Sequence, residues 1–126
     1  MIERYLVSRL DTIPILANKA YPVAAPVGDD ALPICLYSRT DGVITRDLSG
    51  NPAFYTDIFR LDILAEDMDA LCSLEHEVIE ALNEQNVDAG DLYIFSGSAA
   101  PGIEDDYDLR TDTLRRSLIY TVTYWR

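Results

Sequence analysis

The stretch FYTDIFRLDILA, Phe54 to Ala65, runs directly into EDMDALCSLEHEVIEALNEQ, residues 66–85, and this pair decides the fold. Apolar side chains alternate in the first stretch, which predicts a long strand. Its apolar face carries Tyr55, Phe59, Leu61, Ile63 and Ala65. Asp57 is the one exception on that face. In the second stretch apolar residues recur at helical spacing, which predicts an amphipathic helix whose stripe is broken only by Glu75.

The segments before this pair contain one more helix and two more strands. Residues 2–10 place apolar side chains at helical spacing, and residues 13–31 contain Pro and Gly residues that predict an extended loop. Residues 32–40 and 43–48 predict strands separated by a turn at Asp41-Gly42. A second turn at residues 49–52 leads into the long strand, so a hairpin is expected to project there.

The segments after the pair contain two further strands. Residues 86–90 end the helix, residues 92–96 predict a strand, and residues 97–102 are small and predict a loop. Residues 103–109 are acidic and fit an irregular strand or a loop. Residues 113–126 predict a final strand, in which Leu118, Tyr120, Val122 and Tyr124 share one face. Trp125 lies on the opposite face.

This order of elements lacks the alternation of strand and helix that builds a parallel sheet. We therefore expect an α+β fold: a mostly antiparallel sheet of about five strands, with two main helices packed on one face. The length of 126 residues predicts a single domain over residues 1–126.

The charge balance excludes several classes of partner. The chain has 22 acidic and 10 basic side chains, and its formal net charge is −12. Binding of nucleic acid through its phosphates needs clustered Lys and Arg, so no specific nucleic-acid binding is expected. No apolar run approaches the roughly 20 residues of a membrane span, and no membrane partner is expected. An acidic surface also suits a wall past which DNA slides without sticking.

The sequence around the two cysteines predicts neither a disulfide nor a catalytic thiol. Cys35 and Cys72 both sit in apolar runs, so we expect two reduced, buried thiols. A buried thiol in an apolar setting is a poor thiolate. Together with an N-terminus unlike a signal peptide, this favours synthesis in the cytoplasm.

No pattern of residues predicts catalysis, a cofactor or a metal. His76, the only histidine, could pair with Glu80 as two metal ligands, but no third ligand is identifiable, and a solvated helix face is the better interpretation. The sequence lacks phosphate-binding glycine loops and the serine-nucleophile elbow. We therefore predict that the protein is not an enzyme.

Two features suggest interaction surfaces. Glu104, Asp105, Asp106 and Asp108 form the densest acidic cluster, which lacks the glycine and glutamate of a calcium-binding loop. A solvated charged loop is the better interpretation, and contact with a basic surface on a partner is the alternative. Trp125 is the best single candidate for an interface, because Trp and Tyr are enriched at interfaces and its strand face points away from the predicted core.

The landmarks resemble one known family in their order. Tyr21-Pro22 precedes LPICLYSR at residues 32–39, then come the long strand and helix, and RSLIYTV at residues 116–122 closes the chain. Over nearly the whole chain this resembles the phage tail completion, or tail terminator, proteins.

The resemblance implies a phage or prophage virion structural protein of the virion tail, made in the bacterial host cytoplasm. Such a protein caps the tail tube, terminates its polymerisation and joins the tail to the head connector. It implies a hexameric ring whose partners are further copies of the chain, the tail tube protein and the head connector protein, with DNA passing through the ring. In such a ring we expect the acidic cluster to face the DNA channel or a basic partner; its residues are Glu104, Asp105, Asp106 and Asp108.

Two alternatives remain open at this point. A small dimeric α+β ligand-binding or regulatory domain predicts a concave apolar pocket. A small hydrolase or metalloenzyme predicts a metal near His76 or a cleft with shifted carboxylates.

Overall fold

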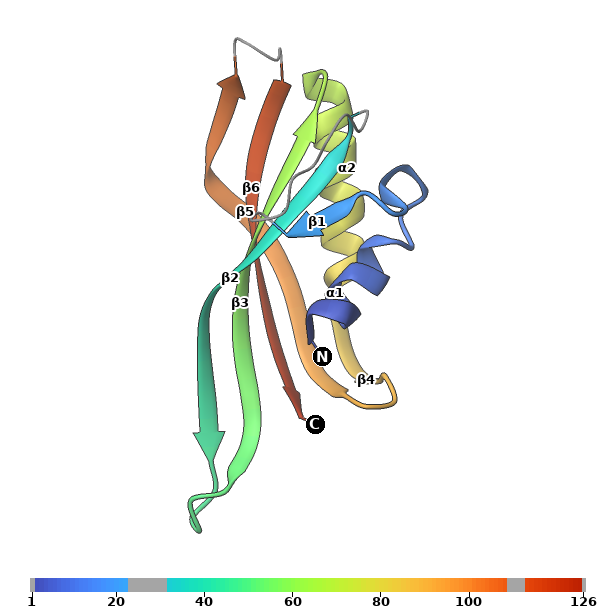
Figure 1. Cartoon of the computed structure of the whole chain (residues 1–126). Helices are drawn as coiled ribbons and strands as arrows, with labels where there is room; N and C mark the ends of the chain where they lie inside the picture. Colours follow the sequence, from blue (N-terminus) through green and yellow to red (C-terminus); the bar gives the residue numbers. More distant parts are fainter. Residues whose placement is uncertain (1, 23–31, 109–112, 126) are drawn as a thin grey trace.

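Two helices lie on one face of a six-stranded sheet in the computed structural model, which describes residues 2–22, 32–108 and 113–125 (Figure 1). Within residues 103–108 it describes the backbone and the side chain of Asp105 alone. The elements along the chain are α1 (Ile2–Leu10), a 3-10 helix (Pro14–Leu16), β1 (Ala20–Pro22), β2 (Ile34–Arg46), β3 (Pro52–Ala65), α2 (Met68–Leu82), β4 (Glu84–Asp88), β5 (Tyr93–Asp108) and β6 (Thr113–Trp125).

The strands lie side by side in the order β1-β2-β3-β6-β5-β4. β1 pairs with β2 in parallel, and the other neighbouring pairs are antiparallel. The predicted α+β class and the mostly antiparallel pairing are confirmed, but the sheet has six strands instead of about five, and one of its pairs is parallel. The two missed strands are short and sit in segments with turn-forming residues: β1 ends at Pro22, and β4 contains Asn86 at a φ of 53°.

The alternation predicted for the two central strands is confirmed by burial. Phe59, Leu61 and Ile63 of β3 are fully buried, as are Leu118 and Val122 of β6. The two strands pair from Tyr55 opposite Tyr124 to Ala65 opposite Leu114. Their apolar faces therefore lie on the same side of the sheet and form one continuous apolar surface, on which the helices pack.

Each of the two helices packs on this apolar surface through one apolar stripe of its own. α2 buries Leu71, Leu74, Val78 and Leu82, and α1 buries Ile2, Tyr5, Leu6 and Leu10. Asp67 caps the start of α2, because its carboxylate accepts the Ala70 backbone N–H at 2.8 Å. None of the described helices is both long and apolar enough to cross a membrane.

The segment from Ile34 to Arg46 is one strand, so the predicted turn at Asp41-Gly42 is wrong. The pairing with β3 shifts by one residue between Arg39 and Asp41, which leaves a β-bulge at Thr40. The bulge absorbs the irregularity and the strand continues. The turn comes later, where the Asp47 carboxylate accepts the backbone N–H groups of Ser49 and Asn51.

β5 runs through residues 97–102, which were predicted to be a loop because their side chains are small. The small size serves packing. A Cβ on Gly97 would lie 3.2 Å from the Leu82 carbonyl oxygen at the end of α2, and one on Gly102 would clash with the Ser117 carbonyl oxygen. These glycines let neighbouring backbone approach closely.

Candidate assembly surface

The β2–β3 hairpin projects beyond the rest of the sheet (Figure 1). We call residues 39–54 the arm. β1 pairs with β2 only at residues 35–37, so along the arm β2 has no strand on its outer side among the described residues. The arm also carries three exposed apolar side chains: Val43 is 56%, Ile44 46% and Leu48, at the tip, 107% exposed. An open edge with exposed apolar residues is suited to a protein contact.

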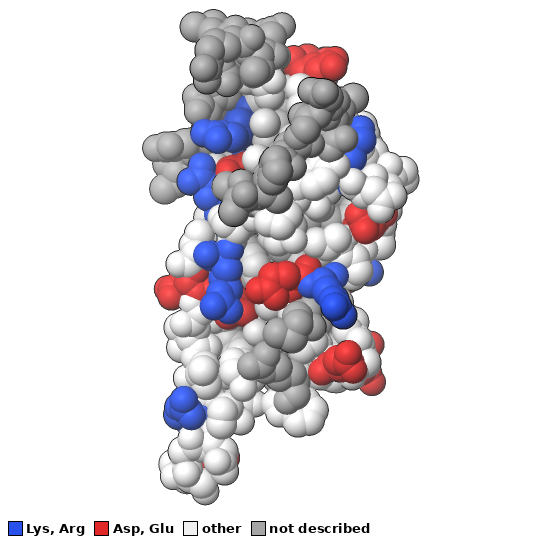
Figure 2. Space-filling model, viewed as in Figure 1, with Lys and Arg blue, Asp and Glu red and all other residues white. Residues whose placement is uncertain are grey.

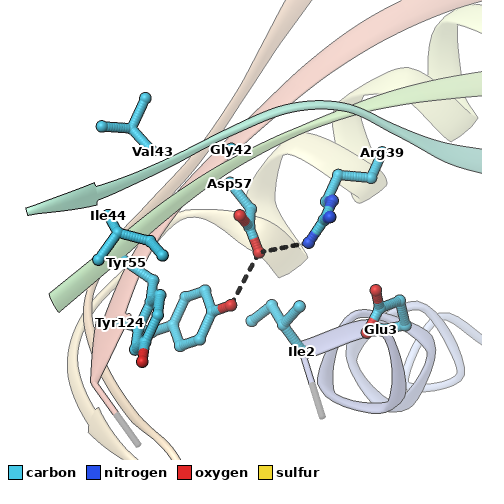
Figure 3. Close-up of a pocket in the computed structure, with 9 residues that line it drawn as sticks. All are labelled: Ile2, Glu3, Arg39, Gly42, Val43, Ile44, Tyr55, Asp57 and Tyr124. Atoms are coloured by element: carbon cyan, nitrogen blue, oxygen red, sulfur yellow. Dashed lines mark hydrogen bonds and ion pairs between the residues drawn. The ribbon is translucent and has the colours of Figure 1, made fainter. Parts of the chain in front are cut away.

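The base of the arm is held by a buried carboxylate. Asp57 of β3 is only 4% exposed, and the Tyr124 hydroxyl of β6 donates a hydrogen bond to it at 2.8 Å (Figure 3). Arg39 Nη1 lies 3.7 Å from the same carboxylate oxygen. A Cβ on Gly42 would lie 2.8 Å from the other oxygen, so any larger residue here would force the Asp57 carboxylate to shift. These contacts tie the arm to the central strands.

Asp57 was recognised in the sequence only as an exception on an apolar face. Its partner Tyr124 was correctly predicted on the buried face of β6. A single charged residue among apolar neighbours, with a tyrosine on another strand of the same face, is the signal that could have found this pair.

A hollow of about 230 Å³ lies between the arm base and the start of α1 (Figure 3). Its apolar lining comes from both elements, and Glu3, Arg39 and Asp57 add charge. The lining residues are Ile2, Glu3, Arg39, Gly42, Val43, Ile44, Tyr55, Asp57 and Tyr124. The buried carboxylate in this lining is the one that accepts the Tyr124 hydrogen bond, so the hollow combines apolar side chains with a charged group that already has a partner.

The opposite face of the sheet carries an aromatic group at the same end as the arm. Phe95 is 42% and Trp125 53% exposed. The Phe95 ring lies 5.2 Å from that of Tyr93 and 6.2 Å from that of Phe54. Trp125 pairs with Tyr93 in the strand register. The exposure of Trp125 agrees with its predicted strand face, and its role as an interface residue remains a prediction.

The acidic stretch of β5 is represented by Asp105 alone, since the side chains of Glu104, Asp106 and Asp108 lie outside the described part. Asp105 is half-exposed and accepts two hydrogen bonds from Arg116, at 2.8 and 2.9 Å. These bonds lower the pKa of the Asp105 carboxyl. Asp105 thus already has a partner within its own chain.

Arg116 links three elements, which the sequence did not reveal. It reaches Asp105 on β5 and Glu75 on α2, the latter at 2.9 Å. Glu75, predicted as the break in the apolar stripe, is partly buried by this contact. Arg116 Nη1 also lies 3.7 Å from the Cys72 sulfur. Such a shared arginine fixes α2 against the sheet.

The thiols differ from the prediction that both are buried. Cys35 is buried, and burial raises its pKa to about 12. Cys72 is exposed. It follows Leu71 in the sequence but lies a third of a turn further round the helix, outside the buried stripe.

The one histidine sits on a solvated helix face. His76 Nε2 lies 3.1 Å from Glu80, with side chains 73% and 69% exposed. Over the described residues, no group of three or more His, Cys, Asp or Glu side chains is arranged to hold a metal ion.

The fold has a counterpart among solved structures. A chain of the structure described as "Virion of native gene transfer agent (GTA) particle" superposes with a TM-score of 0.69 at 15% sequence identity. The match covers 95% of this chain and 90% of that one. The two chains share a fold. No protein-family model and no curated protein matches the sequence.

Proposed function

We propose that this protein is a virion structural component that completes the tail of a phage or phage-like particle. The observation that carries the proposal is the end-to-end likeness to a chain of a gene transfer agent virion, which leaves little of either chain unmatched. The same role is what the order of sequence landmarks implies. Fold likeness alone permits other functions, so the role needs a direct test.

In this role the protein caps the tail tube, ends its polymerisation and joins the tail to the head connector. It acts as a ring of identical copies, a hexamer, located in the virion tail and made in the bacterial host cytoplasm. The projecting arm supports this proposal, because a ring needs a surface on each copy that reaches the next. The net charge of −12 suits a channel through which DNA passes without being held.

The test mixes purified protein with polymerising tail tube protein of the same particle. We expect density at tube ends in electron micrographs, and tubes that stop growing once it is bound. Tubes that lengthen unchanged, with bare ends, would contradict the proposal. The genes flanking this one give an independent check, since capsid, portal and tail-tube genes are expected there.

The alternative of a small dimeric ligand-binding domain has one feature in its favour, the hollow beside the arm. It predicts a two-fold dimer whose thermal stability rises with a small apolar ligand. If such a ligand stabilises the protein while tube ends stay bare, the alternative replaces the tail role.

A further inference from the structure

The arm is open to solvent at its tip, on both of its faces and along its strand edges. Beyond the end of β6 at Trp125, no described strand pairs with the side of β3 that faces away from β2, so the outer arm is only two strands wide. Val43 and Ile44 point to opposite faces of β2 and both are exposed, and Leu48 is fully exposed at the tip. A two-stranded hairpin is marginal by itself in water. Burial of its exposed apolar side chains against a partner molecule would therefore stabilise the arm.

Charge is divided between the two sides of the sheet. The segment of residues 66–108, which forms α2, β4 and β5, contains thirteen of the 22 acidic residues and no Lys or Arg. On the opposite side, the arm and β3 expose Arg39, Arg46 and Arg60, and the arm also exposes Asp41 and Asp47, so the arm itself carries no net charge. In Figure 2 the lower arm is largely uncharged, with basic colour near its tip, and acidic side chains gather at the lower right over the β4–β5 turn.

A matching surface lies on the acidic side, at the same end of the sheet as the arm. Asp88 of β4 pairs with Tyr93 of β5, which pairs with Trp125 of β6, so the three form one row across the sheet. Phe95 contacts Tyr93 beside this row. We call Asp88, Tyr93, Phe95 and Trp125 the acceptor surface. It combines exposed aromatic area with the Asp88 carboxylate, which complements the exposed apolar side chains and the Arg46 guanidinium of the arm.

We propose that the arm of one copy packs on the acceptor surface of the next copy, with Leu48 against the aromatic side chains and Arg46 beside Asp88. The proposal rests on the proposed ring and specifies how its copies touch. The contact joins two different surfaces, so a pair of copies still has one free arm and one free acceptor surface, and the contact repeats until the ring closes. A two-fold contact between acceptor surfaces would instead place Asp88 of one copy beside Asp88 of the other, where like charges repel.

The test uses two variants whose changes lie at exposed residues. The arm variant carries Leu48→Asp and Arg46→Glu, and the acceptor variant carries Asp88→Arg and Trp125→Ala. Sedimentation over a concentration series is expected to show wild-type rings and self-association at least about tenfold weaker in each variant. An equal mixture is expected to give a dimer and nothing larger, because the intact arm of one variant meets the intact acceptor surface of the other.

A matched control carries Glu80→Arg, a charge reversal on the exposed face of α2 outside both surfaces, and is expected to assemble like the wild type. Variants that assemble like the wild type, a mixture without the dimer, or a wild type that stays monomeric throughout would each overturn the contact. If both variants still cap tail tubes as rings, the contact is wrong and the tail function stands. If the mixed dimer forms but the wild type never binds tube ends, the contact stands and the tail function fails.

Discussion

Removing the Tyr124 hydroxyl tests the bond that anchors the arm. In Tyr124→Phe the ring and its stacking on Tyr55, at 5.5 Å, are retained, while the hydrogen bond to Asp57 is lost. Asp57 remains 4% exposed, and Arg39 at 3.7 Å is too distant and too exposed to replace the bond. A buried charged acceptor that loses its donor costs about 1–3 kcal/mol, so we expect about 2 kcal/mol less stability.

The loss is measured by urea unfolding followed by far-ultraviolet circular dichroism. We expect the midpoint to fall with an unchanged slope, and the melting temperature to fall by roughly 8 °C for a chain of this size. The matched control is Tyr93→Phe, whose hydroxyl makes only a 3.5 Å exposed contact with Asn86. It is expected to lose under about 0.5 kcal/mol. If Tyr124→Phe loses no more than this control, Asp57 does not depend on the hydroxyl and the reasoning is refuted.

Three further predictions follow from the packing and the titrating groups. Gly42→Ala places a Cβ 2.8 Å from the Asp57 carboxylate and is expected to lower the free energy of unfolding by about 1–3 kcal/mol in urea; a neutral effect would show that the carboxylate moves freely. Arg116→Met removes the hydrogen bonds that lower the pKa of the Asp105 carboxyl. These bonds stabilise the folded protein fully above about pH 4, the pKa of an aspartate in the unfolded chain. Their contribution is lost as the pH falls through the lower pKa of Asp105 in the folded protein. The wild type is thus expected to lose stability more steeply than the variant in acid unfolding scans, and parallel curves would count against the pair. A thiol reagent is expected to label Cys72 alone in the native protein and Cys35 only after unfolding; equal labelling rates would mean that Cys35 is not shielded.

The central strands and both helices could be predicted because burial imposes a regular period on them. β3 and β6 each bury alternate residues, and α2 buries one stripe, so period alone identifies the element and its inner face. The same alternation placed Trp125 outside. Local turn chemistry was the less reliable guide: Asp41-Gly42 lies inside a strand, because glycine there serves the close approach to Asp57 rather than a reversal of the chain.

The candidate assembly surface could be predicted only in part. Part of the acceptor surface lies on β4, a strand of only five residues. Asn86 of this strand has a left-handed backbone conformation, so local propensity predicts a turn for the segment. Asp88 and Trp125 are far apart in the sequence and meet only through the register of three strands. Likewise the acidic residue Asp105 could not be paired with Arg116 without knowing that β5 and β6 are neighbours.

The long pairing of β3 with β6 has a mechanical consequence for the arm. A pull on the tip along the arm axis is transmitted down β3, which is bonded to β6 continuously from Tyr55 to Ala65. Such a load acts parallel to the strands, so the hydrogen bonds of the ladder resist it together in shear instead of opening one after another. The arm can therefore carry tension from a neighbouring molecule into the core without peeling away from its own sheet.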